Sequence, residues 1–195
     1  MHSIKVGIYG GSFNPIHDGH VQLGDELVAL GLVDELWYVV SPQNPFKVNQ
    51  QLLADELRLK LTEMALQGHK GLKVCDVEMQ MPRPSYMANT LSALRDKHPD
   101  IEFILVIGAD NVERFPCWYK HVEIMAHHRI IVYPRPGYEL NALPEGYTLA
   151  QTSLIDISST AIRQSIAQGT FQGEGLSPAV WQFIQDKGLY RAATN

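Results

Sequence analysis

Five short runs rich in β-branched and aromatic residues constrain the fold of this chain more than any other feature. Each run has the length and composition of a buried strand; they are IKVGIYG from Ile4, ELWYVV from Glu35, LKVCDVEM from Leu72, EFILVIG from Glu102 and RIIVY from Arg129. Between them lie segments whose apolar residues have helical spacing, such as Leu23, Leu27 and Leu30, then Leu57, Leu61 and Ala65. Strand therefore alternates with helix along the chain.

This alternation predicts an α/β fold with a Rossmann-like, doubly wound parallel sheet of about five or six strands and helices on both faces. Ligands of such sheets bind beyond the carboxyl ends of the strands. Near the carboxyl terminus, SSTAIRQSIAQG from Ser158 and SPAVWQFIQDKG from Ser177 each begin with a hydroxyl residue suited to an N-cap and end at glycine. They predict a small helical segment over about residues 157–190. The length of 195 residues fits a single domain spanning 1–195.

Composition narrows the classes of partner. The net charge of −5 and the pI near 5.9 lack the broad basic field of a nucleic-acid-binding protein. The two cysteines, Cys75 and Cys117, form no CxxC pair, which favours a reducing compartment. The longest apolar stretch, at 103–109, is too short to span a bilayer, and the first residues lack a signal-peptide run. We therefore expect a cytoplasmic protein without nucleic-acid or membrane partners, and we leave homo-oligomerisation open.

Residues 10–20, GGSFNPIHDGH, form the densest motif. Gly10 and Gly11 follow the first predicted strand, where they let the backbone turn and approach a ligand closely. Pro15 suits a first helical turn, so a helix is expected to begin around residues 16–18. The spacing matches neither GxGxxG nor GxxxxGK[ST], which excludes the dinucleotide fingerprint and the Walker A loop.

His17 and His20 share one face of this predicted helix start, with Gly19 leaving room for a ligand between them. Imidazoles beside the exposed N–H groups of a helix N-terminus favour a bound anion such as phosphate. Two other interpretations remain at this point. Histidines near a turn are often surface residues or satisfied hydrogen-bonding groups. Zinc would need a third and a fourth ligand, and neither the cysteines nor the later pair His127 and His128 has a spacing that supplies them.

Several motifs together resemble those of one known family. GGSFNPIHDGH resembles the HxGH signature of the nucleotidyltransferase superfamily, and ISSTAIR at 157–163 is similar to its partner motif ISSTxxR. In order and spacing, four further groups and the ending WQFIQDKGLYR are similar to the bacterial nicotinate-nucleotide adenylyltransferases; the four are PSYMANTL from Pro84, GADN from Gly108, FPCWYK from Phe115 and YPRPGY from Tyr133. The resemblance covers essentially the entire chain.

The resemblance implies a reaction in NAD biosynthesis. The adenylyl group of ATP passes to nicotinate mononucleotide, which gives nicotinate adenine dinucleotide and pyrophosphate. The nucleophile is an anionic phosphate oxygen, so no general base is needed, and catalysis consists of positioning and charge neutralisation. Mg²⁺ is expected with ATP, held mainly by phosphate oxygens and water rather than by protein ligands.

The resemblance also assigns roles to individual residues. The catalytic group comprises His17, His20, Lys47 and Arg163. The ATP site is completed by Gly10, Gly11, Ser12, Phe13, Ser158 and Ser159. The nicotinate mononucleotide site comprises Ser12, Lys47, Tyr86, Asn89, Thr90, Asp110, Trp118, Tyr119 and Arg135. Simpler interpretations exist for three of these features: Ser158 to Thr160 as an N-cap, Asp110 as another cap, and Trp118 as core.

Two positions depart from the family pattern. Met87 stands where the family often has threonine, which leaves the selectivity for acid over amide open, and Asn14 stands where the superfamily has aspartate. Asn14 can still hydrogen-bond the backbone at a turn. The alternatives are an adenylyltransferase acting on nicotinamide mononucleotide or phosphopantetheine, and a nucleotide-binding protein without turnover.

Overall fold

The computed structural model describes residues 3–43, 52–138 and 143–192. The strands are β1 (Ile4–Gly11), β2 (Glu35–Val40), β3 (Leu72–Cys75), β4 (Ile101–Gly108), β5 (Ile130–Tyr133) and β6 (Tyr147–Leu149). The α-helices are α1 (Asp18–Ala29), α2 (Asp55–Leu66), α3 (Met87–Lys97), α4 (His121–His127), α5 (Ser159–Ala167) and α6 (Pro178–Asp186). Short 3-10 helices are η2 (Val77–Gln80), η3 (Ala109–Asn111) and η4 (Phe115–Cys117).

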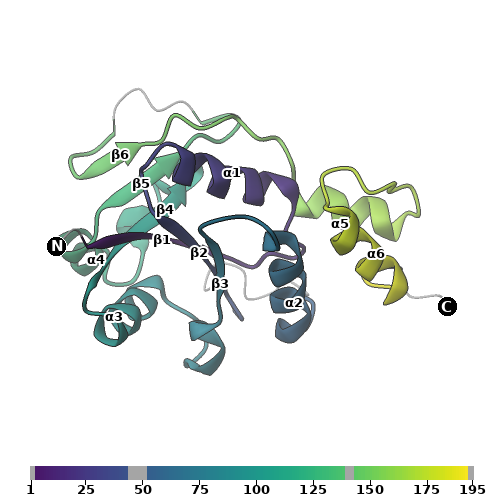
Figure 1. Ribbon diagram of the computed structural model, residues 1–195, viewed down its shortest axis with the longest axis horizontal. Helices are drawn as coiled ribbons and strands as arrows, with labels where there is room; N and C mark the ends of the chain where they lie inside the picture. The colour runs from purple at the N-terminus through teal and green to yellow at the C-terminus, as the bar shows by residue number, and fades with distance from the viewer. Residues whose placement is uncertain (1–2, 44–51, 139–142, 193–195) are drawn as a thin grey trace.

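All six strands form one parallel sheet in the order β3-β2-β1-β4-β5-β6. The chain winds outward from β1 to β3, then returns to the other side of β1 and winds outward through β4 (Figure 1). The prediction of a doubly wound α/β sheet is confirmed. The order reverses between β1 and β4, and ligands of such sheets bind beyond the carboxyl ends of the strands at that point.

Two hydrophobic clusters cover the two faces of the sheet. Alternate residues of β2 separate between them: Leu36, Tyr38 and Val40 belong to the first cluster, whereas Val39 belongs to the second. The first cluster also takes residues from α1, α2, α5 and α6, and the second takes residues from α3 and α4. This division follows from the period of two along a strand, because successive side chains point to opposite faces.

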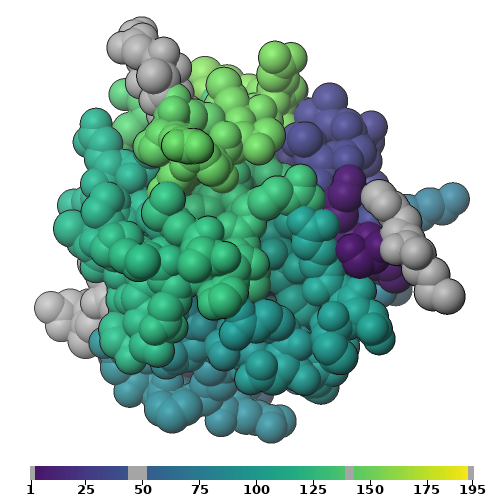
Figure 2. Space-filling view, turned by 90° about the vertical axis from the view of Figure 1, so that its left-hand side faces the viewer, coloured from purple at the N-terminus to yellow at the C-terminus, as the bar shows by residue number. Residues whose placement is uncertain are grey.

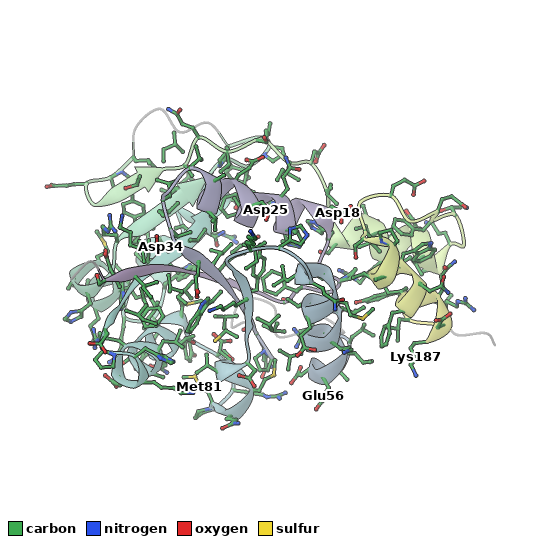
Figure 3. All side chains as sticks on the ribbon, viewed as in Figure 1. Asp18, Asp25, Asp34, Glu56, Met81 and Lys187 are labelled. Carbon is green, nitrogen blue, oxygen red and sulfur yellow. The ribbon has the colours of Figure 1, made fainter. Side chains whose placement is uncertain are left out.

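The amino-terminal and carboxyl-terminal ends of the parallel strands lie on opposite sides of the molecule (Figure 1). Figure 2 looks onto the side where β1 begins, and the first described residues, in purple, reach the surface there. The carboxyl ends of the strands point away from this side, toward α5 and α6 (Figure 1). Figure 3 shows Asp18, at the start of α1, on the side of α5 and α6, whereas Asp34 lies at the opposite end. The backbone N–H of Asp18 donates to the carbonyl of Gly175 at 2.8 Å, which ties α1 to the carboxyl-terminal segment.

The structure differs from the sequence-based expectation at three elements. The strand expected over 72–79 ends at Cys75, because β3 is an edge strand that pairs only with β2, and the chain then turns into η2. Helix α4 and strand β6 were not predicted, since α4 has seven residues and β6 has three, too few for a visible period. The two expected closing helices are confirmed, with Ser158 and Ser177 as their N-caps.

Arg58 of α2 is the largest fully buried side chain, with 0% of its surface exposed. Its Nη1 donates to the carbonyls of Ser12 at 2.6 Å and Ser41 at 2.8 Å, which follow β1 and β2 respectively. Its Nε donates to the carbonyl of Leu53 at 3.1 Å, and its Nη2 pairs with the carboxylate of Asp55 at 2.5 Å. One guanidinium therefore fixes the backbone that follows two neighbouring strands.

Replacing Arg58 by alanine is expected to lower the free energy of unfolding by about 3–5 kcal/mol, because three backbone carbonyls lose their charged donor, while the partly exposed Asp55 keeps its pair with Arg83. Urea denaturation followed by circular dichroism measures this change. Lys60→Ala on the same helix, at a side chain 55% exposed, is the matched control and should stay within about 0.5 kcal/mol of the parent. A loss below about 1 kcal/mol for Arg58→Ala would show that the clamp is not needed.

Candidate active site

Two adjacent cavities open at the carboxyl ends of the central strands. One has a volume of about 390 Å³ and the other about 360 Å³. Both are lined by Gly10, Gly11, Met87 and Trp118, so they meet at the turn that ends β1. We call the larger one the phosphate cavity and the smaller one the aromatic cavity, after the side chains described below.

The phosphate cavity gathers cationic and hydroxyl side chains from distant parts of the chain. Its lining includes all the predicted ATP-site residues that the structure describes, together with Asp110, Arg135 and one cation that the sequence did not single out, Arg114. The predicted members are Gly10, Gly11, Ser12, Phe13, His17, His20, Ser158, Ser159 and Arg163. Lys47 lies outside the described residues, so its predicted role stays a prediction. Three arginines and two histidines against one aspartate make this cavity suited to a polyanion.

Side chains crowd three glycine positions of the motif, and the contacts leave least room for a Cβ at Gly11 and Gly19, because the methionine methyl beside Gly10 can move. A Cβ at Gly11 would lie 2.8 Å from the ring of Phe13, which is itself buried at a φ of 43°. A Cβ at Gly10 would lie 2.5 Å from the terminal methyl of Met87. A Cβ at Gly19 would collide with Ile155, so this glycine admits a neighbouring segment of the chain rather than a ligand as the sequence suggested.

The two histidines lie at the start of α1, as the sequence predicted. His17 is the N-cap, and its backbone N–H donates to Nδ1 of His20 at 3.1 Å. The rings stack with centroids 3.6 Å apart. Because Nδ1 of His20 accepts a hydrogen bond, the neutral form of the ring has its proton on Nε2. The hydroxyl of Tyr38, on β2, donates to the His20 carbonyl at 2.8 Å and so holds the first turn of α1 against the sheet.

His17 is held neutral. Burial and, to a smaller extent, the positive charge of Arg135 lower the pKa of its imidazole to about 4. Only 5% of the residue is exposed, and its Nδ1 has no hydrogen-bond partner among the described residues. Because Arg135 disfavours protonation of this imidazole, an anion placed between the two would offset that charge.

Side chains of the ISSTAIR segment donate hydrogen bonds to backbone carbonyls of the GGSFNPIHDGH motif. Ser159 Oγ donates to the carbonyl of Pro15 at 2.9 Å, and Arg163 Nη1 donates to the carbonyl of Asn14 at 2.8 Å. Ser158 Oγ accepts from the N–H of Ala161 at 3.4 Å as an N-cap, as one interpretation of the sequence held. Ser159 and Arg163 thus join the two motifs. Arg163 also borders the phosphate cavity, where its guanidinium has further donors.

The side chain of Asn14 also binds a residue near the carboxyl terminus. Its Oδ1 accepts from the hydroxyl of Tyr190 at 2.9 Å and from the N–H of Leu53 at 3.3 Å. Asn14 is buried, with 4% exposed. The departure from aspartate therefore keeps the acceptor atom that this position provides. Nothing in the sequence pointed to Tyr190 beyond the resemblance of the tail.

Asp110 and Arg135 lie side by side in the lining of the phosphate cavity. Arg135 Nε lies 3.6 Å from Asp110 Oδ1, an ion pair without a hydrogen bond, and Oδ1 is buried with no hydrogen-bond partner in the described chain. The cap of η3 is Gly108, so the alternative role of Asp110 as a cap is wrong. Its carboxylate remains available to accept from a ligand.

The aromatic cavity has walls from Tyr86, Met87, Trp118 and Tyr119. The rings of Tyr86 and Tyr119 lie 4.8 Å apart, and Trp118 packs against Phe115 at 5.3 Å. The cavity also contains the polar side chains of Ser41, Glu78 and Ser85. An aromatic pocket with a few fixed polar groups is typical of a site for a flat ring.

Two residues assigned to the nicotinate pocket do not line it. Asn89 is exposed on α3 and borders neither cavity. Thr90 is fully buried, and its Oγ1 donates to Glu78 Oε1 at 2.7 Å. The helical turn that begins at Met87 carries both side chains away from the cavity. Glu78 was missed because it was placed in a strand, where no motif marked it.

The described part of the chain has neither a metal-binding cluster nor a membrane-spanning helix. Residues 3–43, 52–138 and 143–192 contain no group of three or more histidine, cysteine, aspartate or glutamate side chains arranged to hold a metal ion. No α-helix in these ranges combines the length and apolar character needed to cross a bilayer.

The doubly wound sheet, its glycine turn and the cationic cavity at the reversal point define a nucleotide-binding α/β protein. The cytidylyltransferase-like family model matches residues 8–165. A protein of Bacteroides thetaiotaomicron named probable nicotinate-nucleotide adenylyltransferase is 42% identical over 94% of this chain and 92% of its own length. One of Flavobacterium johnsoniae with the same name is 35% identical over 96% of this chain and 100% of its own. The chain belongs to the cytidylyltransferase-like family and, within it, to the nicotinate-nucleotide adenylyltransferases.

A solved structure shares the fold. Nicotinic acid mononucleotide adenylyltransferase of Plasmodium falciparum, complexed with NaAD, superposes with a TM-score of 0.82 at 19% identity. The match covers 97% of this chain and 98% of the other. At this identity the likeness establishes the architecture, including the placement of α5 and α6 beside the sheet.

The lowered pKa of His17 predicts an acid-sensitive contribution to stability. The unfolded chain binds a proton at this residue near pH 6.5, whereas the folded protein does so only near pH 4. Stability should therefore be complete above pH 6.5 and fall as the pH drops to 4, by up to about 3 kcal/mol. Urea denaturation from pH 4 to 8 measures it.

His17→Asn, which keeps a good N-cap, should lose this component and give a flatter profile than the parent protein. His127→Asn, at the exposed end of α4, is the control and should keep the parent profile. Identical slopes for the parent and His17→Asn would contradict the burial of a neutral imidazole.

Proposed function

We propose that this protein transfers the adenylyl group of ATP to nicotinate mononucleotide, giving nicotinate adenine dinucleotide and pyrophosphate. The curated relatives that carry this activity in their names match nearly the full length of the chain. The single structural observation that carries the proposal is the junction of two unlike cavities at Gly10 and Gly11. A triphosphate and a mononucleotide placed in them would bring their phosphates together at that turn.

The phosphate cavity takes ATP. Arg163, His20 and Arg114 border it and supply donors to the phosphates, as does the segment Ser158–Thr160. Binding neutralises the charge that made this cavity cationic. Asp110 also borders this cavity, and it accepts from a ribose hydroxyl of nicotinate mononucleotide, the role to which its unpartnered oxygen is suited.

The aromatic cavity takes the acceptor ring. Trp118 and Tyr119 provide faces for stacking, and Tyr86 and Met87 at the start of α3 provide a helix N-terminus. The first N–H groups of a helix have no partner within it and attract an anion. Since Met87 lacks a hydroxyl, these backbone groups must bind the nicotinate carboxylate.

The reaction joins the two sites. A phosphate oxygen of the acceptor attacks the α-phosphorus of ATP, a new P–O bond forms, and the bond to the β-phosphate oxygen breaks as pyrophosphate leaves in line. The nucleophile is already anionic, so the residues need to position both phosphates and stabilise charge on the leaving group. The Nε2–H of His20 is suited to this last role.

Mg²⁺ enters with ATP as part of the substrate. It neutralises phosphate charge, and it is held by phosphate oxygens and water, since magnesium keeps much of its hydration. The arrangement of the described residues agrees with this, because Asp110 is the one carboxylate that borders the phosphate cavity among them.

Pyrophosphate release from ATP, measured with nicotinate mononucleotide, nicotinamide mononucleotide and phosphopantetheine in parallel, tests the proposal. Nicotinate mononucleotide should give the highest kcat/KM. Turnover with phosphopantetheine alone would overturn the assignment, and no turnover with any acceptor would favour a nucleotide-binding protein. The cationic phosphate cavity next to an aromatic one favours catalysis over mere binding.

His20→Ala is expected to lower kcat by about 10²- to 10³-fold, the effect of removing one preorganised donor from the transition state. Single-turnover rates at saturating ATP and acceptor measure the chemical step directly. His69→Ala, at a partly exposed histidine paired with Asp25, is the control and should keep the parent rate. An unchanged single-turnover rate for His20→Ala would remove this residue from the mechanism.

A further inference from the structure

We propose that Glu78 is a specificity-determining residue that recognises the positive charge of the acceptor's pyridinium ring. The inference rests on the proposed function and adds a determinant that none of the sequence motifs contains. It concerns the oxidation state of the ring, because only the oxidised pyridinium form carries a charge on the ring nitrogen.

Glu78 lines the aromatic cavity, and hydrogen bonds hold its carboxylate in place. It borders this cavity although only 2% of its surface is exposed. Ser41 Oγ donates to its Oε2 at 2.7 Å, and Thr90 Oγ1 donates to its Oε1 at 2.7 Å. Both oxygens therefore accept hydrogen bonds, the pattern of an ionised carboxylate. Burial of a carboxylate is costly unless hydrogen bonds or a cation compensate it.

No cation of the described residues forms an ion pair with this carboxylate; Arg58 donates to the carbonyl of Ser41 rather than to Glu78. The described lining of the aromatic cavity contains no lysine, arginine or histidine. The two hydroxyl donors fix the carboxylate and leave its charge unpaired. A cationic group of the ligand would supply the missing partner.

The rest of the cavity selects a flat aromatic cation. Tyr86, Trp118 and Tyr119 offer ring faces, which attract cations as well as stacking partners. A pyridinium ring combines both properties. Its carboxylate would lie against the start of α3, where the anion meets N–H groups, and its ring, over which the positive charge is delocalised, would lie toward Glu78.

The reduced ring is the discriminating probe. The 1,4-dihydro form of nicotinate mononucleotide keeps the carboxylate, ribose and phosphate, but its ring is neutral. The protein should bind the oxidised form about 30-fold more tightly, the effect of opposite unit charges roughly 8 Å apart at an effective dielectric constant near 20. Isothermal titration calorimetry of the full chain with each nucleotide gives the ratio of dissociation constants.

Glu78→Gln keeps the shape and removes the charge, so this ratio should fall to within about threefold of unity. Glu78→Asp retains the charge and should retain a ratio of at least 10-fold. Glu63→Gln, on the exposed surface of α2 with 58% of its side chain exposed, is the matched control and should keep the parent ratio. The KM for ATP should remain unchanged in Glu78→Gln.

Two outcomes would overturn the inference: equal binding of both forms by the parent protein, or a parent-like ratio in Glu78→Gln, which includes an equal loss of affinity for both forms. The first uses the parent protein alone and decides the question even if Glu78→Gln does not fold. Failure of the proposed function is distinct, because the parent protein would then release no pyrophosphate with nicotinate mononucleotide.

Discussion

The guanidinium of Arg58 holds the carbonyls of Ser12 and Ser41 at 2.6 and 2.8 Å, and the active site is built on the two turns that these carbonyls belong to. The first turn borders the phosphate cavity, and Ser41 borders the aromatic cavity. A buried charge is costly, and here Asp55 and three carbonyls offset the cost. Because a single planar group contacts both turns, the relative position of the two cavities depends on where α2 packs.

Asn14 performs a similar function for the carboxyl-terminal helices. Its side-chain oxygen binds Tyr190 and its backbone carbonyl binds Arg163, although these residues lie 176 and 149 positions further along the chain. Ser159 adds a bond to the neighbouring carbonyl of Pro15. The motifs GGSFNPIHDGH and ISSTAIR are thus joined by direct hydrogen bonds. The same contacts place arginine and serine donors at the border of the phosphate cavity.

The two cavities differ in charge, and this difference matches the chemistry of the reaction. Arginine and histidine side chains gather where a triphosphate is to be bound, and His17 is kept neutral by burial and by the charge of Arg135. The aromatic cavity has the carboxylate of Glu78 instead. A mononucleotide with a cationic ring and an anionic phosphate would lie with its ring toward the negative cavity and its phosphate toward the positive one. Such an orientation presents the phosphate to the triphosphate.

The sequence by itself determined the alternation of strand and helix, the N-caps Ser158 and Ser177, and the start of α1 beside His17, because these depend on local periodicity and capping. It also identified Trp118, Tyr119, Asp110 and Arg135, which do border the cavities. Only the tertiary structure decided that Thr90 faces Glu78 instead of the ligand, that Asn89 faces solvent, and that Arg58 and Tyr190 secure the site. These facts depend on hydrogen bonds between segments far apart in the chain, and local residue patterns carry no record of such partners.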